Sequence, residues 1–96
     1  MNTAQQAVES AIKVMGSQQA LARSLGITQP TVAEWKSGLR TVPINRCPDI
    51  EANTASAGEV VRVEQLRPDV KWHRVKDKSW PLADGRPLAD FAGVSA

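Results

Sequence analysis

Residues 18–38 constrain the fold most strongly, because they read as two short helices joined by a turn that glycine adopts easily. Their sequence is QQALARSLGITQPTVAEWKSG. Ala22 is small enough to let two helix backbones approach where they cross. Gly26, four residues later, suits a turn with positive φ, and Ile27 is expected to fill the corner. The spacing is typical of a helix-turn-helix with helices over about 18–25 and 29–37.

The second helix of this pair has a clear start and a clear inward face. Thr28 offers a hydroxyl as the N-cap, and Pro30 falls in the first turn, where a missing N–H costs little. Val32 and Trp35, three residues apart, are expected to pack against the leucines of the first helix.

The outward positions at the start of this helix are those that a recognition helix presents to base edges in the major groove. Glutamine can bond to adenine through two hydrogen bonds, threonine can offer its methyl to thymine, and glutamate can accept from cytosine. An ordinary helical hairpin with a solvated polar face is the alternative. The conjunction of residue types favours DNA binding, with bases read by Gln29, Pro30, Thr31, Ala33 and Glu34.

The distribution of charge supports the same interpretation. Residues 1–46 carry five basic and two acidic side chains, whereas residues 47–96 carry seven basic and eight acidic ones. The positive excess therefore travels with the helix-turn-helix, as phosphate binding requires. Plain solvation of these side chains is the alternative. We predict phosphate contacts from Gln18, Gln19, Arg23, Thr28, Lys36, Ser37 and Arg40.

Two further helices are predicted on either side. Apolar residues recur at helical spacing over residues 3–15, and Thr3 with Gln6 suits a capping box at its start. Residues 43–54 read as a fourth helix. Pro48 is tolerated there only if the helix begins late enough to place it in the first turn.

The chain after this fourth helix is less regular. Residues 59–63 suit either a short edge strand or extended chain, and residues 64–67 a short helical turn. Asp49 and Glu51 are expected to neutralise a helix start rather than to form a catalytic pair, because adjacent positions diverge on a helix. Cys47, on the apolar side, is expected to be a buried small hydrophobe.

Length and composition divide the chain into a domain and a tail. Ninety-six residues allow one small domain with an extension. We predict a DNA-binding domain over residues 1–70 and a C-terminal tail over residues 71–96 that is largely disordered or partner-binding. Trp72, Trp80 and Phe91 are isolated large apolar residues in the tail. They are expected either to anchor a partner or to fold back onto the domain.

Several function classes find no support. No apolar run approaches the ~20 residues of a membrane span, and no signal peptide is visible. The single cysteine excludes an internal disulfide and suits the cytoplasm, and the single histidine offers no metal cluster. No phosphate-binding glycine loop appears. We therefore expect a cytoplasmic protein that is not an enzyme and has no membrane segment, metal or cofactor.

SQQALARSLGITQPTVAEWKSG resembles the lambda-repressor and Cro class of helix-turn-helix domains. RCPDIE and EQLRPDVKW narrow the likeness to the YdaS-like antitoxins, Cro-like regulators of prophage and toxin–antitoxin operons, over about residues 8–73. The resemblance implies an all-α fold of four to five short helices with a flexible C-terminal tail. It also implies a homodimer that binds operator DNA, including its own promoter.

The resemblance also bears on particular residues. Gln18 and Gln29 match the glutamines that cooperate in this class, one bracing at the phosphate and the other reading a base. Pro30 at a reading position removes a donor, so the base preference of relatives does not transfer. The alternative function is an antitoxin-type module that neutralises a toxin through its C-terminal tail.

Overall fold

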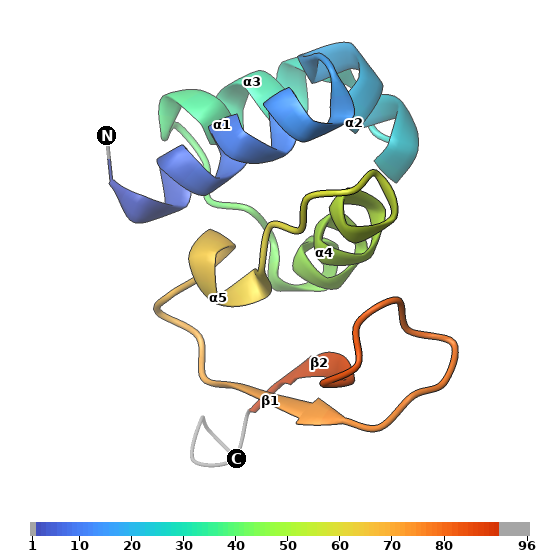
Figure 1. Cartoon of the computed structure of the whole chain (residues 1–96). Helices are drawn as coiled ribbons and strands as arrows, with labels where there is room; N and C mark the ends of the chain where they lie inside the picture. Colours follow the sequence, from blue (N-terminus) through green and yellow to red (C-terminus); the bar gives the residue numbers. More distant parts are fainter. Residues whose placement is uncertain (1, 91–96) are drawn as a thin grey trace.

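The computed structural model describes residues 2–90 and is mostly helical, as predicted. Figure 1 shows three layers: α1, α2 and α3 at one end, α4 and α5 in the middle, and a small hairpin at the other end. The helices are α1 Thr3–Met15, α2 Gln18–Leu25, α3 Gln29–Ser37, α4 Cys47–Ser56 and α5 Val63–Leu66, and the 3-10 turn η1 Ile44–Arg46 leads into α4. The strands are β1 Trp72–Val75 and β2 Arg86–Ala89.

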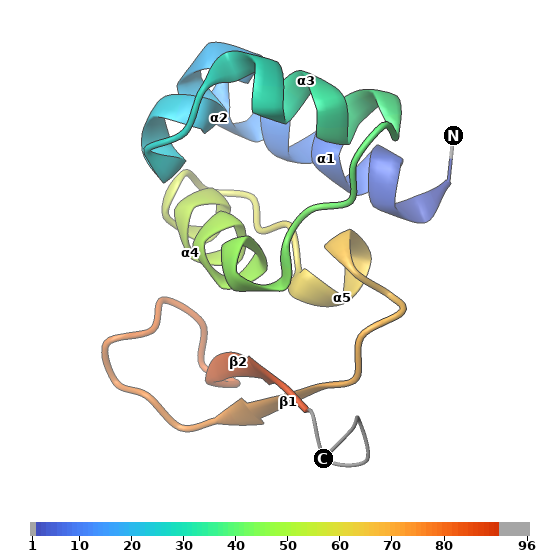
Figure 2. The ribbon, with the colours of Figure 1, turned by 180° about the vertical axis from the view of Figure 1, so that it is seen from behind.

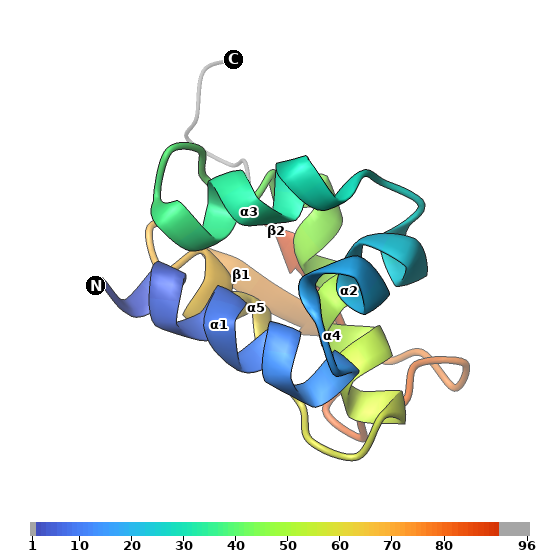
Figure 3. The ribbon, with the colours of Figure 1, turned by 90° about the horizontal axis from the view of Figure 1, so that it is seen from above.

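The core lies where the helices of the first two layers meet. Seen from above, α1 and α3 lie side by side, with α2 at one end of the pair (Figure 3). The predicted inward residues of α3, Val32 and Trp35, are 0% and 3% exposed. They pack with other buried apolar side chains, among them Val8, Ala11, Leu21, Leu25, Cys47, Ile50, Val63 and Leu66.

Helix starts follow local chemistry, with one correction. The capping box of α1 is formed by Asn2 and Gln5, not by Thr3 and Gln6: the Gln5 N–H donates to Asn2 Oδ1 at 2.8 Å. Asparagine caps at least as well as threonine, and it stands one residue earlier. In α4 the proline falls in the tolerated first turn, because η1 supplies the preceding residues.

Residues 59–62 form extended chain, not a strand. The N–H of Val61 is instead satisfied by the hydroxyl of Thr54, at 2.9 Å. Thr54 is fully buried on α4 and also donates to the carbonyl of Ile50. This hydroxyl therefore fixes the α4–α5 connection without a sheet partner.

Glu51 has a role that the sequence analysis did not predict. Its side chain is fully buried on α4 rather than placed at a helix start. One carboxylate oxygen accepts from the Val63 N–H at 3.1 Å and from Arg74 Nη2 at 2.8 Å. The other accepts from Arg74 Nη1 and from Trp80 Nε1. Glu51 thus joins α4 to α5, β1 and the loop between the strands.

The hairpin replaces the expected largely disordered chain over residues 72–90. The strands pair antiparallel, from Trp72 with Ala89 to Val75 with Arg86, as seen below α4 and α5 in Figure 2. Trp72 donates its Nε1–H to the carbonyl of Arg67 at 3.1 Å, and Trp80 donates to Glu51. Both tryptophans of this segment therefore fold back on the domain. Phe91 and the rest of the tail lie outside the described residues. The partner-binding alternative stays a prediction.

We predict that Arg74→Ala lowers the free energy of unfolding by about 3–5 kcal/mol, because it leaves the Glu51 carboxylate buried without its counter-ion. Glu64→Ala is the matched control. Glu64 contacts the same guanidinium at 2.8 Å but is 52% exposed, so its loss should cost about 1 kcal/mol or less. Urea denaturation of both variants measures the difference. Equal losses would contradict the role given to Glu51.

Candidate nucleic-acid interface

The turn between α2 and α3 has the predicted conformation. Gly26 ends α2 in the left-handed region at φ 69°, ψ 29°, and the Ile27 N–H donates to the carbonyl of Ala22 at 3.0 Å. Ala22 is 2% exposed, as expected at a helix crossing. A β-branched or bulky residue would be strained at this φ, so glycine sets the angle at which α3 leaves α2.

The start of α3 differs from the prediction in one bond. Thr28 is the N-cap residue, with extended backbone, but its hydroxyl makes no capping hydrogen bond. It lies instead 3.0 Å from the hydroxyl of Thr31, one turn later. Pro30 stands in the first turn, where its missing N–H is harmless.

The five predicted base-reading residues all lie on α3. Gln29 and Pro30 are exposed, while Thr31, Ala33 and Glu34 are half-buried. The Gln29 Nε2–H donates to Oε1 of Gln18 at 3.4 Å, which links the start of α3 to the start of α2. The two glutamines that the resemblance pairs therefore touch. Their contacts with DNA remain predictions.

The predicted phosphate-binding residues surround α3. Gln19, Arg23, Lys36 and Arg40 are exposed. Two shallow hollows flank the helix: one is lined by Gln19, Ala22, Arg23, Ile27 and Gln29, and the other by Thr31, Glu34, Trp35, Arg40, Thr41 and Pro43. Candidate base and phosphate groups of α2, α3 and the following loop thus line these two hollows, Gln19, Arg23 and Gln29 the first and Thr31, Glu34 and Arg40 the second.

Some of these groups already have partners within the protein. The Ser37 hydroxyl donates to the carbonyl of Glu34 at 3.2 Å, and Arg40 Nε lies 3.3 Å from Oε1 of Glu34. Arg46 also belongs to the positive first half, but it donates to the carbonyl of Leu25 at 3.0 Å. Thr41 was not predicted, although it lines the second hollow; its place beside Arg40 in the short loop after α3 was the available signal.

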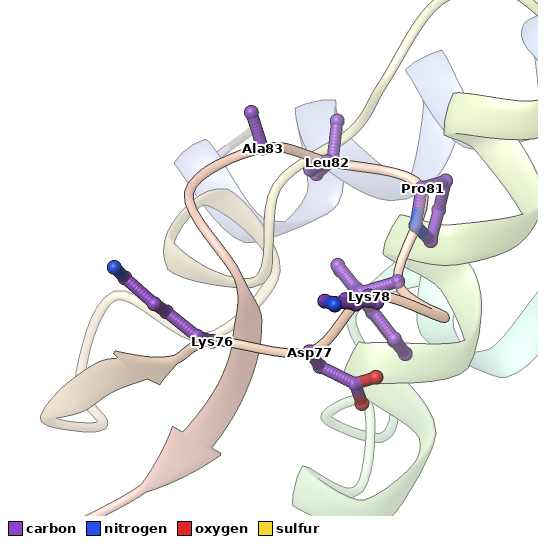
Figure 4. Close-up of a pocket in the computed structure, with 7 residues that line it drawn as sticks. Lys76, Asp77, Lys78, Pro81, Leu82 and Ala83 are labelled. Carbon is purple, nitrogen blue, oxygen red and sulfur yellow. The ribbon is translucent and has the colours of Figure 1, made fainter.

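Outside this surface, the structure offers little that suggests chemistry. A hollow in the loop of residues 76–85 is lined by side chains that diverge rather than converge, as Figure 4 shows. Its acidic member, Asp77, is bound by Ser79 and Arg86. Among residues 2–90, no group of His, Cys, Asp and Glu side chains suits a metal ion. No helix in that part is long and apolar enough to cross a membrane.

Cys47 is buried at the start of α4, as expected of a small hydrophobe. Its side chain is 0% exposed, and its Sγ–H donates to the carbonyl of Pro43 at 3.5 Å. Burial raises the pKa of this thiol to about 12. A thiol that stays protonated at neutral pH is a poor nucleophile.

Residues 8–75 match the sequence profile of a family described as bacterial toxin YdaS. The chain belongs to this family. The family's description names a toxin, whereas the resemblance above implied an antitoxin. The match ends at residue 75, so the loop of residues 76–85 and β2 lie beyond it.

Individual relatives point to regulation. The chain is 47% identical over 64 residues to "Putative transcriptional regulator YdaS" of Escherichia coli strain K12, an alignment that covers 67% of this chain and 62% of the relative. Its fold resembles a Cro protein from a prophage element of Xylella fastidiosa strain Ann-1, with a TM-score of 0.59 and 43% identity. That likeness covers 68% of this chain and 94% of the Cro protein.

The raised pKa of Cys47 predicts a loss of stability at alkaline pH. The folded thiol keeps its proton up to about pH 12, whereas the unfolded thiol loses it near pH 9. The folded state therefore holds the extra proton in this window, and stability should fall by about 1.4 kcal/mol per pH unit as pH rises through it. Denaturation of wild type and Cys47→Ala from pH 8 to 11 tests this. Parallel pH profiles for the two proteins would refute the assignment.

Proposed function

We propose that the protein is a sequence-specific DNA-binding transcriptional regulator that inserts the start of α3 into the major groove. The hydrogen bond between Gln29 and Gln18 is the main observation in support. It holds the exposed amide of Gln29 on α3 against Gln18 at the start of α2. In the proposed complex Gln18 lies near the DNA phosphates and Gln29 faces the bases. The Cro-like fold and the regulator among the relatives agree with this proposal.

The other residues of this surface take complementary roles in the proposal. Thr31, Ala33 and Glu34 follow Gln29 along α3 and meet neighbouring base edges. Exposed groups on both sides of α3 approach the phosphates and fix the orientation of the domain. Besides Gln18, these are Gln19, Arg23, Thr28, Lys36, Ser37 and Arg40.

The proposed binding unit is a homodimer on a two-fold operator, in its own promoter, in the cytoplasm. One domain carries few basic side chains near α3, and specific affinity grows with the number of phosphates neutralised. A symmetric dimer doubles both the phosphate and the base contacts. We propose that binding there represses its own operon.

Toxin neutralisation by the tail is the weaker alternative. It requires large apolar side chains of the tail that are available to a partner, namely Trp72, Trp80 and Phe91. Trp72 and Trp80 donate their indole N–H groups to Arg67 and Glu51 within the domain. A tail-borne partner site would therefore depend mainly on Phe91 and the residues around it.

A fluorescence-anisotropy titration tests the proposal. The full chain is titrated against a duplex from upstream of its own gene and against a scrambled duplex, over a salt series. Preference for the upstream duplex, with affinity falling steeply as salt rises, is the expected result. Equal and weak binding to both duplexes would reject the proposal and shift attention to a protein partner.

We predict that Gln29→Ala costs about 1–3 kcal/mol of binding on the preferred duplex and relaxes discrimination at one base pair. Gln6→Ala is the control, because Gln6 is an exposed glutamine of α1 outside the α2–α3 pair. Anisotropy on the preferred duplex and on its single-pair substitutions measures both effects. An unchanged base preference in Gln29→Ala would remove Gln29 from the reading surface.

A further inference from the structure

Glu34 is the only acidic residue between Glu9 and Asp49, and it stands on α3 among the groups proposed to face DNA. A carboxylate in this place is repelled by phosphates. Its Oε1 lies 3.3 Å from Nε of Arg40, in the loop after the helix. The surface therefore carries an ion pair at this place. An arginine without an acidic partner would attract DNA more strongly.

The backbone returns Arg40 to Glu34. The N–H of Arg40 donates to the carbonyl of Glu34 at 3.2 Å, and the Ser37 hydroxyl donates to the same carbonyl. Gly38 makes the turn at φ 83°, in the left-handed region that favours glycine. The placement of Arg40 is thus built into the chain.

This backbone anchoring matters because the ion pair is weak by itself. The side chains of Arg40 and Glu34 are 70% and 36% exposed, and such surface pairs contribute little to stability. This pair contributes little to stability, yet the backbone holds it in place. It is therefore suited to a role at the surface. Thr31, a candidate base reader, lines the same hollow as both of them.

We propose that Glu34 is the residue by which this surface rejects DNA of the wrong sequence, with Arg40 as the positioning residue that holds its carboxylate. This inference rests on the proposed function. In the major groove cytosine presents an amino donor, which is the group that a carboxylate accepts from best. Adenine presents a donor beside its N7 acceptor, and guanine and thymine present acceptors that repel a carboxylate. Glu34 therefore lowers the affinity for most DNA sequences. Where a cytosine faces the carboxylate, the hydrogen bond from its amino group offsets this loss.

Arg40 thereby takes a different role from the phosphate contact that the sequence analysis and the proposed function give it. A phosphate contact strengthens binding to every sequence alike, whereas a positioning residue changes the base preference. The two assignments are therefore separable by experiment. Arg23, an exposed arginine of α2, provides the reference for a phosphate contact.

The test begins with selection by the full-length wild-type protein from a pool of randomised duplexes. The preferred duplex, its single-pair substitutions and a scrambled duplex are then titrated by anisotropy. The variants are Glu34→Gln, Arg40→Gln and Arg23→Gln. Glu59→Gln is the control, since it makes the same change of net charge on the loop between α4 and α5. Thermal denaturation confirms that each variant is folded.

Glu34→Gln should bind the scrambled duplex about 3- to 10-fold more tightly, because the cation beside it becomes free to neutralise a phosphate. It should also lose discrimination at one C·G pair, by about 5- to 150-fold. Arg40→Gln should relax the preference at that same pair. Arg23→Gln should weaken binding to all duplexes alike, with its salt dependence reduced by about one phosphate.

Two results would overturn the inference while leaving the proposed function intact. One is a Glu34→Gln variant that selects the same sequence as wild type and binds scrambled DNA no more tightly than Glu59→Gln. The other is an Arg40→Gln variant that behaves like Arg23→Gln, which would return Arg40 to a phosphate. If wild type selects no sequence at all, the proposed function fails and this inference fails with it.

Discussion

The buried carboxylate of Glu51 is the constraint on which the lower half of the molecule depends. A charge that is removed from water must be matched by a cation and by further donors, or it destabilises the fold. Here Arg74 supplies the cation, and the Val63 N–H and the Trp80 indole supply the donors. The network helps to hold the short hairpin in place, because four-residue strands alone provide little cohesion. The Arg74–Glu51 pair also links β1 to α4.

The opposite end of the molecule is organised by different physics. The geometry of α2 and α3 is set by local backbone chemistry, above all by the left-handed glycine at the turn and the small residue at the crossing. Apolar packing by Val32 and Trp35 then fixes α3 on the core. On its outward face the side-chain bonds are local, as between Gln29 and Gln18 and between Glu34 and Arg40. In the proposed function, recognition therefore belongs to the layer of α2 and α3, and the buried ion pair of Glu51 to the opposite half.

This division explains what could be predicted from the sequence. The bounds of α2 and α3 were predictable because their signals lie within a few residues of each helix end. The role of Glu51 was not, because its partners Arg74 and Trp80 stand 23 and 29 residues away in the sequence. The hairpin escaped prediction for the same reason: a distant ion pair holds it, and no apolar alternation marks it.

The candidate site shows the same limit on a smaller scale. The residues on α3 followed from helical spacing, but the pairing of Arg40 with Glu34 depends on how the chain returns after Gly38. A count of charges in the sequence likewise does not show which cations are bonded within the protein. Of the five basic side chains in residues 1–46, Arg46 is bound to a carbonyl and Arg40 to a carboxylate, which leaves Lys13, Arg23 and Lys36. Lys13 lies on α1, so in the proposed complex Arg23 and Lys36 give only modest affinity for phosphates. Accurate base contacts, repeated by a second subunit, would then have to supply the rest.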